Sequence, residues 1–150
     1  MHSPFWALLD NTYFWAALWA WIIAQCIKMV AGYYRTRRLD FKYLVSTGGM
    51  PSAHSSTVSG LATAVGLGTG FDSPVFTVAL CLALIVMFDA STVRRAAGQQ
   101  AKLLNELVDE LFREHHLSEV KLKELLGHTR LEVLMGMITG ILVGMLVMSH

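Results

Sequence analysis

Charged residues are scarce in this chain. Asp, Glu, Lys and Arg make up 15% of its 150 residues, whereas soluble domains contain about 25%. Apolar and aromatic residues account for 54%, a composition that argues against a soluble globular protein. The 12 basic residues nearly balance the 11 acidic ones, so net charge gives no reason to expect a nucleic-acid partner.

Cysteine is rare as well, which excludes a disulfide-rich scaffold. Cys26 and Cys81 each lie within apolar sequence, which favours packing residues over a disulfide. Their spacing does not fit a cysteine metal site. We therefore expect no metal site built on cysteine.

Four long runs have no charge at all, and they fall at residues 11–27, 43–71, 73–88 and 133–150. A bilayer core of about 30 Å needs roughly 20 mostly apolar residues to cross it. The first run lacks the basic start of a signal peptide. The sequence therefore predicts a single all-α domain over residues 1–150, an integral membrane helical bundle with four spans at about 11–31, 53–70, 73–88 and 131–148.

Basic residues are absent outside two segments, Lys28–Lys42 and Arg94–Arg130. The positive-inside rule places both segments in the cytoplasm. The N-terminus, the turn at 72–74 and the C-terminus then face outside. The sequence thus predicts a multi-pass protein with its basic loops at the cytoplasmic face.

A polar insertion at about 97–127 separates the third and fourth predicted spans. Apolar residues such as Leu103, Leu104 and Leu107 recur with helical spacing, which indicates an amphipathic helix. Ser118 can cap a second helix that ends near Gly127. We expect a cytoplasmic helical hairpin that packs on the spans, on a partner or at the lipid interface.

Small residues mark two of the predicted spans. Gly136, Gly140 and Gly144 recur every four residues in the last span, and further glycines lie at Gly60 and Gly66 in the second. Such spacing lets helices approach closely in lipid. These glycine-rich helix faces favour close packing between helices, either within one chain or between two chains. A homodimer through them is therefore one option.

Polar groups suited to phosphate gather at the predicted cytoplasmic boundary. The segment 48–57 leads through two glycines and a proline into a helix that carries His54 in its first turn, and a helix N-terminus favours an anion. His128 and Glu132 are four residues apart, so they share a helical face. The cations near the same boundary are Lys28, Arg35, Arg94 and Arg95.

Each of these features has a simpler explanation, since helix caps use serine and basic residues snorkel at membrane edges. Topology alone accounts for the cations. It does not account for two histidines and the carboxylate of Glu132, which are costly near lipid. Together they favour phosphoryl chemistry.

The motifs Gly49–His54, Asp89–Gly98 and Gly127–Thr129 with Glu132 resemble those of the divergent phosphatidic acid phosphatase type 2 related membrane proteins, which are related to acid phosphatases and vanadium-dependent haloperoxidases. Lys28, six residues and Arg35 are similar to the first motif of that superfamily. Ala53 stands where its second motif has glycine, and Glu132 where its third has aspartate.

The resemblance implies hydrolysis of a lipid or isoprenoid phosphate, or a pyrophosphate, through a phosphohistidine. His128 would attack phosphorus, Glu132 would orient it and His54 would protonate the leaving oxygen. The phosphate-binding set would be Lys28, Arg35, Ser52, Ala53 and one of Arg94 and Arg95. The cations are side chains, so the scheme needs no metal and no cofactor.

Two other functions compete with the phosphatase. One is a catalytically silent membrane protein that binds phosphate head groups or a partner with the same pocket. The other is a small transporter or channel, which fits less well because the polar residues gather at one face and the span centres are apolar.

Overall fold

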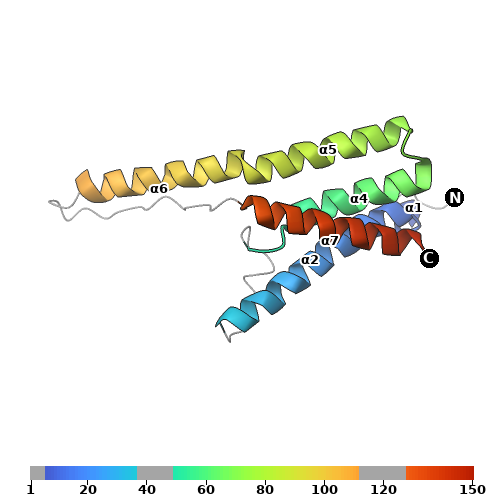
Figure 1. The fold of residues 1–150 in the computed structure, drawn as a ribbon, viewed down its shortest axis with the longest axis horizontal. Coiled ribbons are helices and arrows are strands. Elements are labelled where there is room, and N and C mark those ends of the chain that lie inside the picture. Colours follow the sequence, from blue (N-terminus) through green and yellow to red (C-terminus); the bar gives the residue numbers. More distant parts are fainter. Residues whose placement is uncertain (1–5, 37–48, 112–127) are drawn as a thin grey trace.

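The computed structural model describes residues 6–36, 49–111 and 128–150. Its elements there are all helices: α1 (Trp6–Leu9), α2 (Thr12–Thr36), α4 (Ala53–Thr69), α5 (Pro74–Ser91), α6 (Val93–Leu111) and α7 (Arg130–Met148). Figure 1 shows α2, α4, α5 and α7 gathered in a bundle, with α6 continuing beyond it along the direction of α5. The predicted all-α fold is confirmed for the described residues.

Polar side chains set where the bundle helices begin. One side chain at the start of each of α2, α4, α5 and α7 accepts a hydrogen bond from a backbone N–H of the first turn; they are Asn11, Ser52, Ser73 and Thr129. Helix starts leave several N–H groups without an intrahelical partner, and such caps satisfy them. The helix boundaries therefore follow from local sequence.

Within the described residues, three helical stretches are long and apolar enough to cross a membrane: Thr12–Tyr34, Pro74–Val108 and Arg130–Met148. The predicted span 53–70 forms α4, whose 17 residues reach only about 26 Å at a rise of about 1.5 Å per residue, short of a core of about 30 Å. α4 contacts α2, α5 and α7, so it is the inner helix of the bundle. Four spans are therefore not confirmed.

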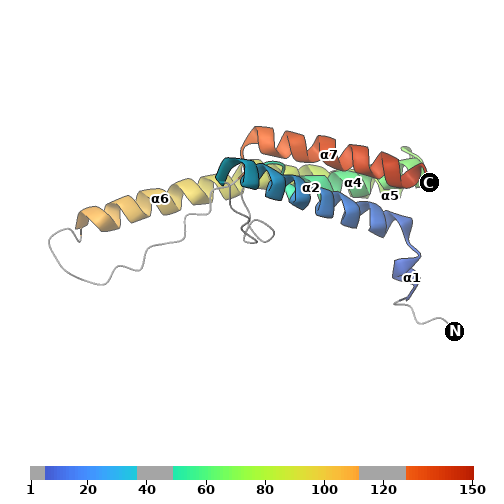
Figure 2. The same cartoon turned by 90° about the horizontal axis from the view of Figure 1, so that it is seen from below.

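The helix that follows the third predicted span begins earlier in the structure than the insertion predicted from the sequence. α6 begins at Val93 rather than near residue 97, and it follows α5 after a single capping residue, Thr92. Figures 1 and 2 both show α6 leading away from the bundle instead of packing on it. The second helix of the hairpin, predicted from Ser118 to Gly127, lies outside the described residues, so the hairpin stays a prediction.

The glycines of α7 face α4 within the same chain. They are Gly136, Gly140 and Gly144, and a β-carbon on each would collide with a backbone oxygen of α4, namely that of Ser52, Ser56 and Gly60 in turn. Of the two options for this face, the structure shows packing within one chain. The homodimer stays a prediction.

A stripe of alanines on α2 completes the inner contacts of α4. Ala16, Ala20 and Ala24 are all fully buried. The Ser56 hydroxyl donates a hydrogen bond to the Ala20 carbonyl oxygen at 2.8 Å, and a β-carbon on Gly60 would lie 2.8 Å from the Ala20 β-carbon. Small residues thus let α2 and α7 approach α4, the kind of packing that joins helices in lipid.

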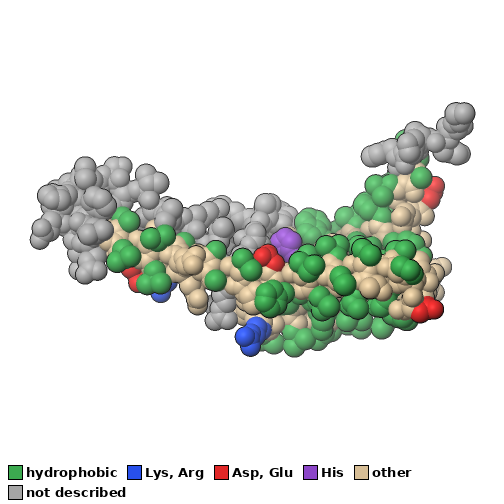
Figure 3. Space-filling view, turned by 90° about the horizontal axis from the view of Figure 1, so that it is seen from above, with side chains coloured by type: hydrophobic (Ala, Val, Ile, Leu, Met, Phe, Trp, Pro, Cys, Tyr) green, Lys and Arg blue, Asp and Glu red, His purple; other side chains and the backbone are tan. Residues whose placement is uncertain are grey.

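The outer surface of the bundle is apolar. Figure 3 shows hydrophobic side chains spread over it, and Val78, Ile85 and Leu146 are 70%, 66% and 62% exposed. Cys26 and Cys81 are also exposed rather than packed inside. An apolar surface of this extent fits lipid rather than water.

We expect Gly140→Ala to lower the free energy of unfolding by about 1–3 kcal/mol, as overpacking does, although alanine is the better helix former by about 1 kcal/mol. The added methyl would collide with the Ser56 carbonyl oxygen. Thermal unfolding in detergent, followed by circular dichroism, measures the change. Leu142→Ala, on the exposed face of α7, should stay within about 0.5 kcal/mol. A Gly140→Ala protein as stable as the original would contradict this packing.

Candidate functional site

The N-terminal ends of α4 and α7 lie side by side and form the candidate site. The Ser52 N–H donates a hydrogen bond to the Glu132 carbonyl oxygen at 3.0 Å. One turn further along α7, Gly136 has no β-carbon where one would collide with the Ser52 carbonyl oxygen. Two helix N-termini, each with the positive end of its dipole, therefore meet at one place, an arrangement that favours an anion.

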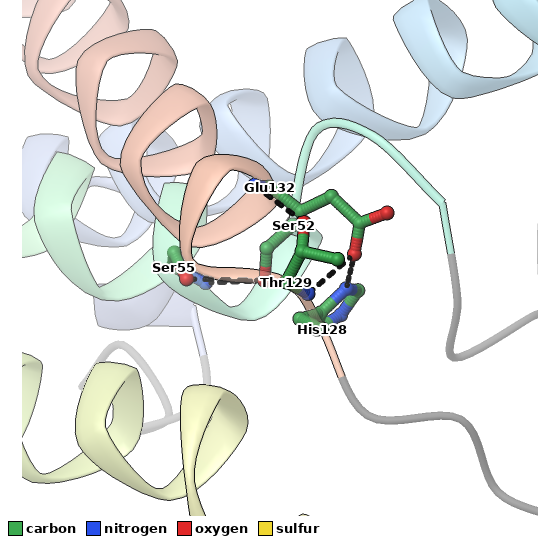
Figure 4. A network of polar contacts seen from close by, with 5 residues as sticks. All are labelled: Ser52, Ser55, His128, Thr129 and Glu132. Carbon is green, nitrogen blue, oxygen red and sulfur yellow. Dashed lines mark hydrogen bonds and ion pairs between the residues drawn. The ribbon is translucent and has the colours of Figure 1, made fainter. Parts of the chain in front are cut away.

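His128 lies at this meeting point, directly before the cap of α7, and is 1% exposed. Its Nδ1 is 3.1 Å from Glu132 Oε2, as Figure 4 shows. An ionised carboxylate only accepts hydrogen bonds, so Nδ1 carries the proton. In the neutral ring, Nε2 then keeps a lone pair, which is what a nucleophile or base requires.

Glu132 is held in place by the start of its own helix. Its Oε2 also accepts a hydrogen bond from the Thr129 N–H at 3.0 Å, while its N–H donates to Thr129 Oγ1 at 3.2 Å. This reciprocal pair is a capping box. From the sequence, Thr129 was named only as part of the motif 127–129; its capping role was not predicted, although the pattern Thr-x-x-Glu at 129–132 was the available signal.

His54 reaches the site from the first turn of α4. Its ring centroid lies 6.5 Å from that of His128, with the ring planes 59° apart. Unlike His128, His54 is exposed. The structure thus brings together the two predicted histidines from the starts of different helices. The His54 side chain is exposed on the surface, and the His128 side chain is buried.

Lys28 enters the same cluster from α2. Its side chain is 3% exposed, and its stem packs so close to Gly49 that a β-carbon there would lie 3.5 Å from Lys28 Cγ. Gly49 has φ +93°, a conformation that glycine adopts readily. An enclosed cation is costly without an opposite charge nearby, and Glu132, in the first turn of α7, carries the acidic group of this cluster.

Ser52 and Ala53 are buried, at 0% and 4% exposure. Ser52 Oγ accepts hydrogen bonds from the Ser55 N–H at 3.4 Å and from the Ser55 hydroxyl at 3.0 Å. The Ser52 hydroxyl still has its own proton to donate. In this arrangement Ser52 serves as a helix cap, and its contact with phosphate stays a prediction. Sequence analysis missed Ser55.

The three arginines of the predicted set are located only by their backbones. Arg35 belongs to the last turn of α2, and Arg94 and Arg95 to the first turn of α6. Their side chains lie outside the described part of the structure, so their roles stay predictions. Among the described residues, no group of three or more His, Cys, Asp or Glu is placed to hold a metal ion.

These features define a helical membrane protein with a polar cluster at one end of its bundle. The chain belongs to the divergent PAP2 family, which residues 9–143 match. The uncharacterized membrane protein YuiD of Bacillus subtilis (strain 168) is 44% identical to it over 146 residues, which cover 90% of this chain and 92% of that protein. No solved structure matches the chain significantly.

Replacing Thr129 with alanine should lower the free energy of unfolding by about 0.5–2 kcal/mol, because the cap of α7 is lost. The Glu132 N–H would lose its acceptor, Thr129 Oγ1, while the Thr129 N–H would still donate to Glu132 Oε2. The looser first turn of α7 should weaken the contact of Glu132 with His128. Thermal unfolding in detergent measures the first effect, and the NMR signal of the His128 Nδ1 proton measures the second.

Thr129→Ser is the matched control, since serine caps helices as well as threonine does. It should keep both the stability and the proton signal. If alanine and serine at this position behave alike, the capping box does not hold Glu132.

Proposed function

We propose that this protein is a membrane-embedded phosphatase that hydrolyses a lipid or isoprenoid phosphate, or a pyrophosphate, through a phosphohistidine. One observation carries the proposal: His54 and His128 face each other at 6.5 Å between ring centroids, and Glu132 holds His128 by Nδ1. A nucleophile with an orienting carboxylate on one side and a second titratable group opposite is the arrangement that covalent catalysis requires. Membership of the divergent PAP2 family supports the same reaction class.

In the first step, His128 Nε2 forms a bond to phosphorus and the bond from phosphorus to the leaving oxygen breaks. His54 gives its proton to that oxygen, so the alcohol leaves neutral. Reacting atoms sit about 3–3.5 Å apart before reaction. In this proposal one phosphoryl group lies beside both rings, whose centroids are 6.5 Å apart.

In the second step, a water oxygen attacks phosphorus, the bond from phosphorus to Nε2 breaks, and His54 takes the proton of the water. The cationic ring of His128 in the intermediate is stabilised by Glu132. Lys28 supplies positive charge toward the phosphoryl oxygens, together with Arg35 and one of Arg94 and Arg95. Side-chain cations therefore neutralise the negative charge of the phosphoryl oxygens.

We place the site at the cytoplasmic face of the membrane. The N-terminal ends of α4 and α7 share the end of the bundle from which α6 leaves, and α1 and the C-terminal end of α7 lie at the opposite end (Figure 1). All twelve Lys and Arg fall in residues 28–42 and 94–130. α2 ends, and α6 and α7 begin, at the first of these ends (Figure 1). Such a bias marks the cytoplasmic side.

A second function has its own supporting observation. His128 is 1% exposed and Ser52 is 0% exposed, so a phosphate would have to enter an enclosed site. A catalytically silent protein that binds phosphate head groups or a partner at the exposed His54 requires no such entry. The two functions differ in whether phosphate is released.

His128→Ala should reduce phosphate release from a panel of lipid phosphates to below about one-thousandth of the original rate, because the nucleophile is lost. Purified protein and a colorimetric phosphate assay are sufficient. His150→Ala removes a histidine from the exposed C-terminal end and should leave the rate unchanged. Hydrolysis that survives His128→Ala in a clean preparation would exclude the phosphohistidine route.

His54→Ala should slow hydrolysis of an alkyl phosphate by about 10²–10⁴-fold, the range for a missing general acid. It should slow hydrolysis of para-nitrophenyl phosphate far less, because that leaving group departs without a proton. The ratio of the two rates is the measurement. Equal losses on both substrates would show that His54 does not protonate the leaving oxygen.

The topology predicts that a cysteine at position 110 is reached only from the cytoplasm. In a chain with Cys26→Ala and Cys81→Ala, an impermeant maleimide should label Glu110→Cys only after permeabilisation. Asp72→Cys, in the turn before α5, should be labelled in intact cells. Labelling of position 110 in intact cells would reverse the orientation.

A further inference from the structure

An apolar groove runs along the bundle between α4, α5 and α7. Its volume is about 290 Å³, and apart from Ser59 and Thr63 every lining residue is apolar. α5 and α7 both pack on α4 and contact each other much less. The groove is the space that this packing leaves between them.

Small side chains form the floor of the groove and longer ones form its walls. The floor on α4 includes Ser59, Ala62 and Thr63, while α5 contributes Leu80 and Met87 to one wall. The other wall, on α7, consists of Met137, Ile141 and Met145. Methionine adapts its shape to irregular partners, so such walls suit a flexible apolar chain.

Each end of the groove is marked by a defined contact. Phe71 and Phe76 meet edge to face at one end, with ring centroids 5.1 Å apart. At the other end, the Ser59 hydroxyl lies 3.9 Å from the Met87 sulfur. From Ser59 to Leu67 the groove follows α4 for about 12 Å, given a rise of about 1.5 Å per residue.

The groove begins at Ser59, deeper along α4 than the candidate site. Ser52 and Ser59 are two helical turns apart, so they share one face of α4. On α7, each wall residue directly follows one of the glycines that contact α4. The site and the groove therefore lie one after the other along the same two helices.

We propose that this groove binds one hydrocarbon chain of the lipid whose phosphate occupies the site between His54 and His128. The proposal rests on the proposed function, because the head group defines where the chain begins. A chain that enters beside Ser59 has apolar walls on both sides and meets the Phe71–Phe76 pair at its far end. The groove thus suits a lipid phosphate that can place one chain between α5 and α7.

The test uses photolabelling of the full chain in lipid nanodiscs. The probe is a hexadecyl phosphonate with a diazirine in the middle of its chain, and the matched probe is hexadecanol with the same diazirine. The phosphonate should label peptides that contain Met87, Met137 or Ile141. Excess inorganic phosphate should reduce that labelling severalfold and leave labelling by the alcohol unchanged.

Three labelling results would overturn the proposal. In the first, the phosphonate labels only lipid-facing residues such as Val78 and Ile85, and the chain then lies outside the groove. In the second, both probes label the groove equally and inorganic phosphate does not compete, and bulk lipid then occupies the groove. A photoreactive amino acid at Ile141 that yields a covalent dimer would show that a second copy occupies it.

A pair of variants on neighbouring residues tests the same site by kinetics. Ile141→Trp fills the groove, whereas Leu142→Trp places the same side chain on the exposed face of α7. For hexadecyl phosphate, Ile141→Trp should raise KM at least about tenfold, and Leu142→Trp less than about twofold. Neither should alter hydrolysis of para-nitrophenyl phosphate by more than about twofold. Equal effects of the two variants on KM would count against the groove.

The two proposals fail separately. The phosphonate is not hydrolysed, so groove labelling that competes with phosphate supports the groove even if no substrate is turned over. Conversely, hydrolysis abolished by His128→Ala, with no labelling of the groove, keeps the phosphatase and removes the groove.

Discussion

The close approach of α7 to α4 is the contact on which the rest of this structure depends. Gly136, Gly140 and Gly144 leave no room for a β-carbon beside the α4 backbone. Lipid provides no hydrophobic force between helices, so helix association in a membrane relies on such packing. Because α4 and α7 contact each other along their length, their N-terminal ends come together. The polar cluster is a consequence of that alignment.

At those ends, hydrogen bonds hold the side chains and the two helix starts in defined positions. The Ser52 N–H joins α4 to the Glu132 carbonyl oxygen at 3.0 Å, and the Glu132 carboxylate fixes the proton on His128. The low dielectric of an enclosed site strengthens these interactions and makes unpaired groups costly. Lys28, which is 3% exposed, and Glu132 bring opposite charges to this one cluster, where each lowers the cost of burying the other.

The inner position of α4 reconciles its composition with its place in a membrane protein. Its serines would be costly against lipid, but Ser52, Ser55, Ser56 and Ser59 are all buried inside the bundle. Apolar side chains instead cover the outer surfaces of α5 and α7. α4 therefore provides both the polar end, at His54, and the floor of the apolar groove. This combination suits a ligand with one polar and one apolar part.

Features within one or two helical turns followed from the sequence alone: the apolar helices and the pairing of His128 with Glu132. Helix geometry determines such neighbours without reference to the rest of the chain. The tertiary structure decided that α4 is an inner helix, that α6 extends α5, and that His54 meets His128. Those contacts join residues far apart in sequence. They depend on which small residues let two backbones approach, and spacing alone left open whether the glycines of α7 face this chain or another.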